Sequence, residues 1–280
     1  MIAAIAIAVL IVQPLSTFSI GVETGGPQLR ALFAQPGLNL RFFLATFVVM
    51  PALAIALGVF AHLPAPLWEG LTLMSIAPPA PPSTRRLRKM GRVDLGLTWQ
   101  DEAFVISIVT IPLTVAIVQS LGLVGKDIVL NWVPMIQRSI LFFGAPMLAG
   151  LLVRRYLPAL AAALVKPTGI AATIGLAVLA ILASIVAIPV LVHYRIMSTA
   201  VVVAFVAVAV LVGHLLGGPG SATRVTLVAM LAARFPVPAM ILAQSNGAIK
   251  AILPVILVHV IAGVVLVPIY ARLTRSQTIA

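Results

Sequence analysis

Arg234 is the residue of this chain whose type and position most need a chemical explanation. It stands in the stretch RVTLVAMLAARFPVPAMILA, within a long apolar run and directly before Phe235 and Pro236. A guanidinium at membrane depth costs several kcal/mol unless it is paired or hydrated. Its planar fork suits bidentate contact with a carboxylate. The position therefore indicates a solute-binding group or a fixed cation at an ion site, and the alternative is a structural ion pair.

Two proline-rich stretches interrupt the apolar runs of this chain. Their prolines are Pro78, Pro79, Pro81 and Pro82 in the first stretch and Pro236 and Pro238 in the second. Proline removes a backbone donor and clashes with the preceding turn, so neither run can continue as a regular helix. Unwound backbone at membrane depth is tolerated only inside the protein or along a wet cavity. We expect both stretches to be broken helices that meet in the interior.

Asp101 and Glu102 are two of only six acidic residues in the chain. Either carboxyl could pair with Arg234, or take up a proton and couple it to another process. The alternative places both at the cytoplasmic interface, facing water and the basic cluster of residues 85–92. Neighbouring side chains that could complete a polar cavity are those of Thr98 and Gln100.

The composition predicts an all-α integral membrane protein with a single domain over residues 1–280. Hydrophobic residues make up 62% of the chain and charged residues 9%, and the mean hydropathy is +1.20. A soluble domain is nearer 45–50% apolar, and long spanning segments must be helical because lipid offers the backbone no partners. We expect about nine spans, near residues 1–20, 42–61, 67–84, 94–120, 132–153, 168–188, 197–216, 225–244 and 249–271.

The chain offers little that an enzyme would need. It has no cysteine, and its four histidines stand apart from one another. Thiolate metal sites and cysteine nucleophiles are therefore excluded. We expect no enzyme activity, no metal site and no cofactor, although a membrane-embedded enzyme stays as a minor alternative.

The positive charges predict how the protein lies in the membrane. With the N-terminus outside, thirteen of the 18 lysines and arginines fall in inner loops and three in outer loops. Cytoplasmic loops are enriched in these residues, so we expect a cytoplasmic C-terminus in the plasma (inner) membrane. The cluster at residues 85–92 suits acidic lipid head groups, and the net charge of +12 gives no reason to expect nucleic-acid binding. Trp68, Trp99 and Trp132 lie near span ends, as interfacial aromatic belts predict.

The two interrupted segments suggest an internal repeat. Pro82 and Pro112 have the same separation as Pro238 and Pro268. Spans two to four and seven to nine would then form two units that enter the membrane from opposite sides. Paired broken helices in corresponding halves of a chain are typical of the binding site of a secondary transporter. The alternative is a chance match in a proline-rich chain.

The chain as a whole resembles the bile acid:sodium symporter family, in a divergent bacterial type. The resemblance rests on the order and spacing of STFSIGVETGGPQLRALFAQPG, FVVMPALAIALGVFAHLPAPLWEGLTLMSIAPP, VISIVTIPL and RVTLVAMLAARFPVPAMILA. It implies an inverted repeat with two crossing broken helices, nine or ten spans, and a core domain beside a panel domain. The core would take residues 41–120 and 197–271 approximately, and the panel residues 1–20 and 132–188. It also implies transport of organic anions, such as bile acids and small carboxylates, by alternating access.

The same resemblance implies a sodium site from which this sequence departs. Sodium-binding members offer hydroxyls and amides at the first break, near Ser83 and Thr84, and a Gln on the preceding helix, where Thr46 stands. On the second broken helix Met230 replaces a Glu and Arg234 replaces a Gln. Hard cations take oxygen ligands, and methionine offers none. We therefore expect transport that is not sodium-coupled in the usual way.

Other readings stay open at this point. A sodium-dependent symporter of the same family is the main alternative. A carrier or channel of a sister family with similar crossed helices, such as the auxin-efflux-like proteins, is a further one. The expected partners are a small organic anion and membrane lipids, and a homodimer is a weaker expectation.

Overall fold

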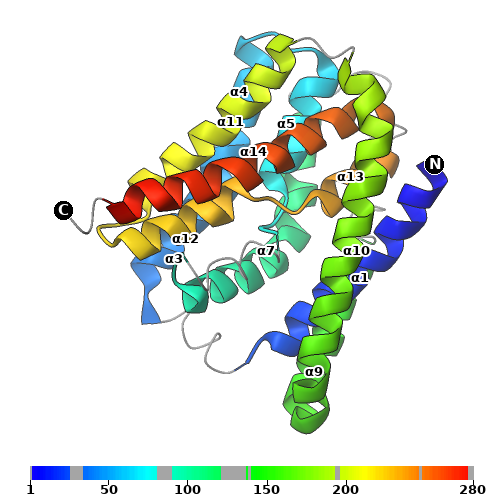
Figure 1. Ribbon diagram of the computed structural model, residues 1–280, viewed down its shortest axis with the longest axis vertical. Helices are drawn as coiled ribbons and strands as arrows, with labels where there is room; N and C mark the ends of the chain where they lie inside the picture. The colour runs from blue at the N-terminus through cyan, green and yellow to red at the C-terminus, as the bar shows by residue number, and fades with distance from the viewer. Residues whose placement is uncertain are drawn as a thin grey trace.

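The computed structural model describes residues 2–25, 34–80, 90–120, 137, 140–192, 196–245 and 248–276 (Figure 1). In these ranges the regular structure is helical and no strand is formed, in agreement with an all-α fold. The α-helices are α1 (Ile2–Glu23), α3 (Pro36–Leu44), α4 (Met50–Phe60), α5 (Ala65–Ile76), α7 (Val93–Ser120), α9 (Ala145–Tyr156), α10 (Pro158–Val192), α11 (Ile196–Leu216), α12 (Ser221–Ala232), α13 (Pro236–Ser245) and α14 (Ile249–Ser276). Two π-helical turns, η1 (Ala45–Val49) and η2 (Ile140–Gly144), precede α4 and α9.

Five helical segments of the described chain are long and apolar enough to cross a membrane. They are Pro36–Phe60, Val93–Ser120, Pro158–Val186, Ile196–Leu216 and Ile249–Thr274. Large apolar side chains on their outer faces, such as Val109, Ile174 and Leu211, are exposed. Contact with lipid tails explains an apolar exterior of this kind. The protein is therefore an integral, multi-pass membrane protein.

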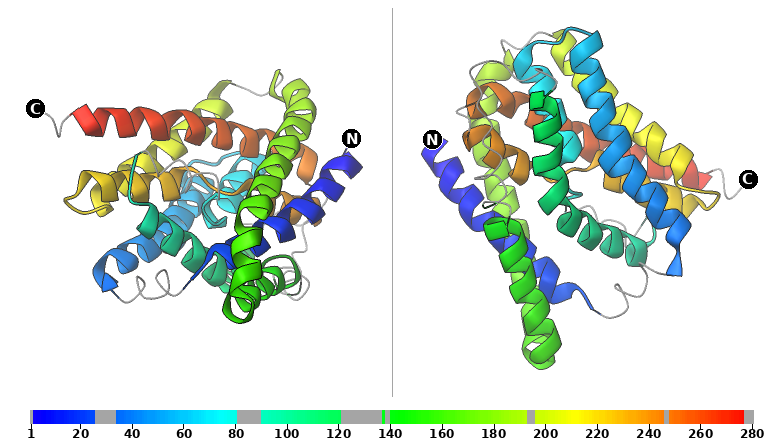
Figure 2. Two further views of the ribbon diagram at one scale, coloured as in Figure 1. Left: turned by 60° about the horizontal axis from the view of Figure 1, so that its bottom comes forward. Right: turned by 180° about the vertical axis from the view of Figure 1, so that it is seen from behind.

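The helices form two groups that pack mainly within themselves. One group consists of α1, α9 and α10, and Figure 2 shows α1 lying alongside the other two in both views. The other group contains α4, α5, α11, α12 and α14. Its apolar interior, to which α3 and α7 also contribute, includes Phe42, Trp99, Phe205 and Met230. The helices that precede the two proline-rich stretches, α5 and α12, both belong to this second group.

Two glycines let α1 and α9 approach closely. A Cβ atom added at Gly150 would lie 2.5 Å from the carbonyl oxygen of Phe18 and 2.7 Å from the amide nitrogen of Val22. An added Cβ at Gly21 would meet the backbone of α9 in the same way. Small residues at such crossings are how membrane helices gain packing contacts without a hydrophobic driving force.

We expect Gly150→Val to lower the melting temperature of the purified protein. The branched side chain would force α9 away from α1, and overpacking of this kind costs about 1–3 kcal/mol. Thermal unfolding followed by gel filtration or differential scanning fluorimetry measures the change. Gly37→Ala is the control, because an added Cβ there has open space around it. Equal melting temperatures for Gly150→Val and wild type would contradict the close approach.

Some helix boundaries differ from those expected from hydropathy. Helix α10 begins at Pro158 rather than near residue 168, and Leu157 alone separates it from α9. Proline suits the first position of a helix, where its missing N–H would have no acceptor. Helix α3 likewise begins at Pro36 rather than near residue 42. Hydropathy locates the lipid-crossing part of a helix, whereas these prolines mark where the helix itself starts.

The prediction that Trp99 lies in an interfacial belt is wrong. The indole N–H of Trp99 donates to Oδ1 of Asn39 at 2.8 Å, and both side chains are buried. The ring stacks on that of Phe42 with 5.1 Å between centroids. A buried indole needs a hydrogen-bond acceptor, and Asn39 supplies it. Trp68 is buried as well, and Trp132 lies outside the described residues.

Candidate functional site

The two proline-rich stretches end helices as expected. Helix α5 ends at Ile76, and Ala77 after it is extended, with φ −65° and ψ 141°. Helix α12 ends at Ala232, and α13 starts at Pro236. Pro236 and Pro238 fall in the first turn of α13, where backbone N–H groups have no acceptor within the helix, so neither proline removes a helical hydrogen bond there. Pro82 lies outside the described residues.

The two breaks pair with each other. The amide of Phe235 donates to the carbonyl oxygen of Pro78 at 2.8 Å, and the amide of Ala80 donates to that of Ala233 at 2.9 Å. Pro79 and Arg234 thereby form an isolated antiparallel bridge. The prediction that the broken segments meet in the interior is confirmed. Each break supplies partners for the backbone groups that the other leaves outside a helix.

The Arg234 side chain binds the carboxyl ends of both interrupted helices. It is 2% exposed. Nε donates to the carbonyl oxygen of Leu231, in the last turn of α12, at 3.0 Å. Nη1 donates to that of Ala77, directly after α5, at 2.9 Å. The C-terminal end of a helix carries partial negative charge, so the guanidinium lies where two such ends converge.

Arg234 is not held by an acidic side chain in the part of the chain that the structure describes. The ion pair found there joins Arg92 to Asp94 at the start of α7. The predicted alternatives, a structural ion pair and pairing with Asp101 or Glu102, are thus not formed among these residues. The Nη2 atom of Arg234 is buried and has no hydrogen-bond partner among them. Within the described ranges, the groups that bind this positive charge are backbone carbonyl groups.

Other buried polar groups lie in the same helix group. Thr46 is fully buried in the π-helical turn η1, and its hydroxyl has no partner among the described residues. His259 on α14 is 1% exposed, and neither ring nitrogen has a partner among them. One turn further along α14, a Cβ atom added at Gly263 would lie 2.5 Å from the carbonyl oxygen of Ala232, which places this part of α14 at the end of α12. His259 was not predicted as a site residue, although a histidine inside an apolar span is a signal for one.

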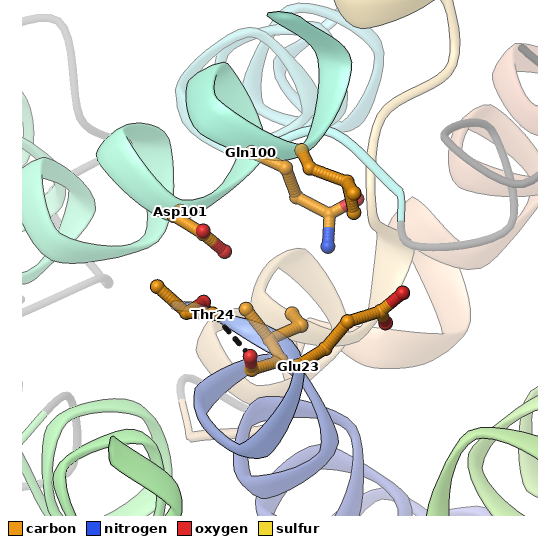
Figure 3. A pocket seen from close by; sticks show the side chains of 6 residues that line it. Glu23, Thr24, Gln100 and Asp101 are labelled. Atoms are coloured by element: carbon orange, nitrogen blue, oxygen red, sulfur yellow. Dashed lines mark hydrogen bonds between the residues drawn. The ribbon is translucent and has the colours of Figure 1, made fainter. Parts of the chain in front are cut away.

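A second polar site lies between the end of α1 and α7. Its lining side chains are Ile20, Glu23, Thr24, Leu97, Gln100 and Asp101. Figure 3 shows the side chains of Gln100 and Asp101 directed from α7 toward the end of α1, where Glu23 and Thr24 lie. Gln100 and Asp101 thus line one polar site, and Thr98 is not among its lining residues. The structure adds Glu23 and Thr24, and the scarcity of acids was the available signal for Glu23.

The remaining predicted site residues are less well placed. Glu102 is partly buried, and its Oε2 atom has no partner among the described residues. Ser83 and Thr84 lie outside the described residues. Thr98 donates its hydroxyl to the carbonyl oxygen of Asp94 at 2.9 Å, so that hydroxyl hydrogen is used within α7.

Residues 8–198 match the model of the Sodium Bile acid symporter family. The match covers more than half of the chain. The chain belongs to this family. A search of curated proteins finds no match. The Sodium Bile acid symporter family is a family of transporters, and membership, together with the apolar helices, shows a membrane transporter and argues against an enzyme. Arg234 lies beyond the matched residues, in the part of the chain where the sequence departs most from the expected sodium ligands.

Proposed function

We propose that this protein is a secondary carrier of small organic anions that works by alternating access without binding sodium in the usual way. One observation carries the proposal. The guanidinium of Arg234 donates to the carboxyl ends of both interrupted helices. The family match supports the carrier function.

A sodium ion and the Arg234 guanidinium would compete for the same oxygens. Sodium prefers oxygen ligands, and helix-end carbonyls such as those of Leu231 and Ala77 suit it. Met230, buried one turn before Arg234, contributes none. Two unit charges 4 Å apart repel by about 4 kcal/mol at an effective dielectric constant of 20, which corresponds to a roughly 1,000-fold weaker affinity. The guanidinium of Arg234 therefore supplies the positive charge that a sodium ion would bring, and this charge is fixed to the chain and does not dissociate.

The proposed architecture has about nine spans in a core and a panel. Helices α1, α9 and α10 pack together as a panel would, and α4, α5, α11, α12 and α14 pack together as a core would. The paired breaks of α5 and α12–α13 support an inverted repeat. Rocking of core against panel about the paired breaks would alternate access. The proposed location is the inner membrane, with the C-terminus in the cytoplasm. A homodimer is a further expectation.

The alternative is a sodium-dependent symporter, which the family description names. The Thr46 hydroxyl favours it, because it is a buried oxygen without a partner among the described residues. The charge of Arg234 weighs against it. No cofactor is part of either proposal.

Uptake into proteoliposomes tests the proposal. Uptake of a series of radiolabelled organic acids, from short carboxylates to bile acids, is measured in sodium chloride and in choline chloride. We expect at least one acid to be taken up, to saturate, and to enter at equal initial rates in both salts. Protein-free liposomes are the control. Strong stimulation by sodium would overturn the sodium-independent mechanism, and no uptake of any acid would overturn the choice of organic anions.

A further inference from the structure

We propose that Asp101 is a proton-binding site that couples solute transport to the proton gradient. The proposal rests on the carrier function argued above and names its coupling ion. It comes from a different part of the molecule than Arg234, namely the cavity between the end of α1 and α7.

The Asp101 carboxyl is buried, aimed into this cavity and incompletely bonded. It is 8% exposed, and its Oδ2 atom has no hydrogen-bond partner among the described residues. Thr24, which faces it in Figure 3, gives its hydroxyl hydrogen to the carbonyl oxygen of Ile20 at 2.9 Å. A buried carboxylate with an oxygen that lacks a donor is costly, and binding a proton there removes part of that cost.

The charges around Asp101 favour a bound proton as well. The helical elements packed against α7 are α1, α3, α5, α12 and η2. Their charged groups within the described chain are Glu23 on α1, Arg41 on α3, Glu69 on α5 and Arg224 on α12, whereas η2 has none. Of these, Glu23 is the one that lines the cavity, and Arg224 donates to the carbonyl oxygen of Gly218 instead. Glu23 adds like charge, which a proton on Asp101 relieves.

The size of the cavity selects a proton over a larger ligand. The space open to the centres of water-sized molecules is ≈ 10 Å³, which is room for about one water molecule. An organic solute does not fit in this space, and a sodium ion would have to shed its water for a short set of side-chain oxygens. One water molecule is enough to deliver a proton to Asp101.

The position of the site explains how protonation would be coupled to movement. Helix α1, which belongs to the proposed panel, ends at Glu23, and Thr24 follows it. Helix α7 carries Gln100 and Asp101. Two negative carboxylates oppose closure of α1 on α7, and the neutral Asp101 carboxylic acid permits it. Water then takes the proton from Asp101 when the panel swings away on the other side of the membrane. One proton moved with one monocarboxylate transfers no net charge.

Infrared difference spectroscopy of the purified full-length protein tests proton binding without a solute. Titration in detergent should show the carbonyl stretches of protonated carboxylic acids, and Asp101→Asn should remove one of these bands. Asp94→Asn is the matched control, since it changes the same side chain two turns earlier on α7, where Asp94 is exposed and paired with Arg92. Asp101→Glu should keep a protonated band, and it serves as the second variant if the asparagine protein does not fold. A wild-type spectrum without such a band, or identical bands in wild type and Asp101→Asn, overturns the proposal.

A transport assay is the second test of the proposal. It uses the organic acid that the wild-type protein takes up fastest in the uptake assay. An inward proton gradient should raise the initial rate at least about fivefold, the scale of an ordinary coupling free energy, in wild type and in Asp94→Asn. Asp101→Asn should lose the stimulation but still exchange labelled for unlabelled acid across the membrane. If the rate of wild-type uptake does not change with the proton gradient, proton coupling is overturned, whereas the carrier function is not. If wild type takes up no acid at all, the carrier proposal fails, and the infrared band still decides whether Asp101 binds a proton.

Discussion

Arg234→Met is expected to lower the initial rate of uptake at least about 100-fold, equivalent to about 2.7 kcal/mol. The substitution keeps a long side chain but removes the donors that satisfy the carbonyl groups of Leu231 and Ala77. Each buried acceptor left without a donor costs about 1–3 kcal/mol. It also removes the positive charge from the point where two helix ends converge. Uptake into proteoliposomes, normalised to the amount of inserted protein, measures the effect.

The matched control is Arg224→Met, on α12, the helix that ends two residues before Arg234. The Arg224 side chain is half-buried and its Nε donates to the carbonyl oxygen of Gly218 at 2.6 Å, but it lies at the start of α12 and away from the break. We expect this variant to keep most of its uptake. Arg234→Lys retains the charge with a single donor group. Its initial rate of uptake should lie between the rates of wild type and Arg234→Met. A folded Arg234→Met protein, judged by gel filtration and melting temperature, that transports like wild type would refute the role of Arg234.

The broken helices could be predicted from the sequence because proline acts locally. The closely spaced prolines of the two stretches disfavour a continuous helix wherever the rest of the chain lies, whereas single prolines such as Pro14 and Pro112 stay inside α1 and α7. The position of Arg234 in an apolar run marks it as unusual. Its partners could not be predicted in the same way. Backbone carbonyl groups are present at every residue, so no residue type marks Leu231 or Ala77 as acceptors. The course of the backbone at the two breaks in the folded protein brings these two oxygens to one guanidinium.

The Asp101 cavity shows a different limit. Glu23 and Asp101 are far apart in the sequence, and each by itself suggests an interfacial carboxylate. Their meeting depends on how α1 packs against α7, which hydropathy does not specify. Trp99 illustrates the same limit, because a tryptophan near a span end fits an interfacial belt until Asn39 is found to accept its hydrogen bond. Periodicity and hydropathy place residues along the membrane normal, whereas side-to-side packing decides which of them meet.

Sodium dependence should be gained by the double variant Met230→Glu/Arg234→Gln. Met230 is fully buried in the last turns of α12, one turn before Arg234. The pair of changes restores the carboxylate and amide oxygens that the family resemblance places on the second broken helix, and it frees the carbonyl oxygens of Leu231 and Ala77. Oxygens of these kinds are the ligands that a hard cation takes.

We expect the initial uptake rate of the double variant to rise at least about tenfold when choline is replaced by sodium, a change worth about 1.4 kcal/mol in binding. Arg234→Gln alone should be inactive in both salts, because it loses the guanidinium and an amide without the carboxylate leaves no negative charge to hold the ion. Met230→Glu alone should remain insensitive to sodium, since the new carboxylate pairs with Arg234 and a buried pair resists separation. Potassium in place of sodium separates a specific site from a general salt effect. If the double variant folds and transports equally in both salts, then the guanidinium of Arg234 does not occupy the place of an ion, and its contacts with the two helix ends serve the structure alone.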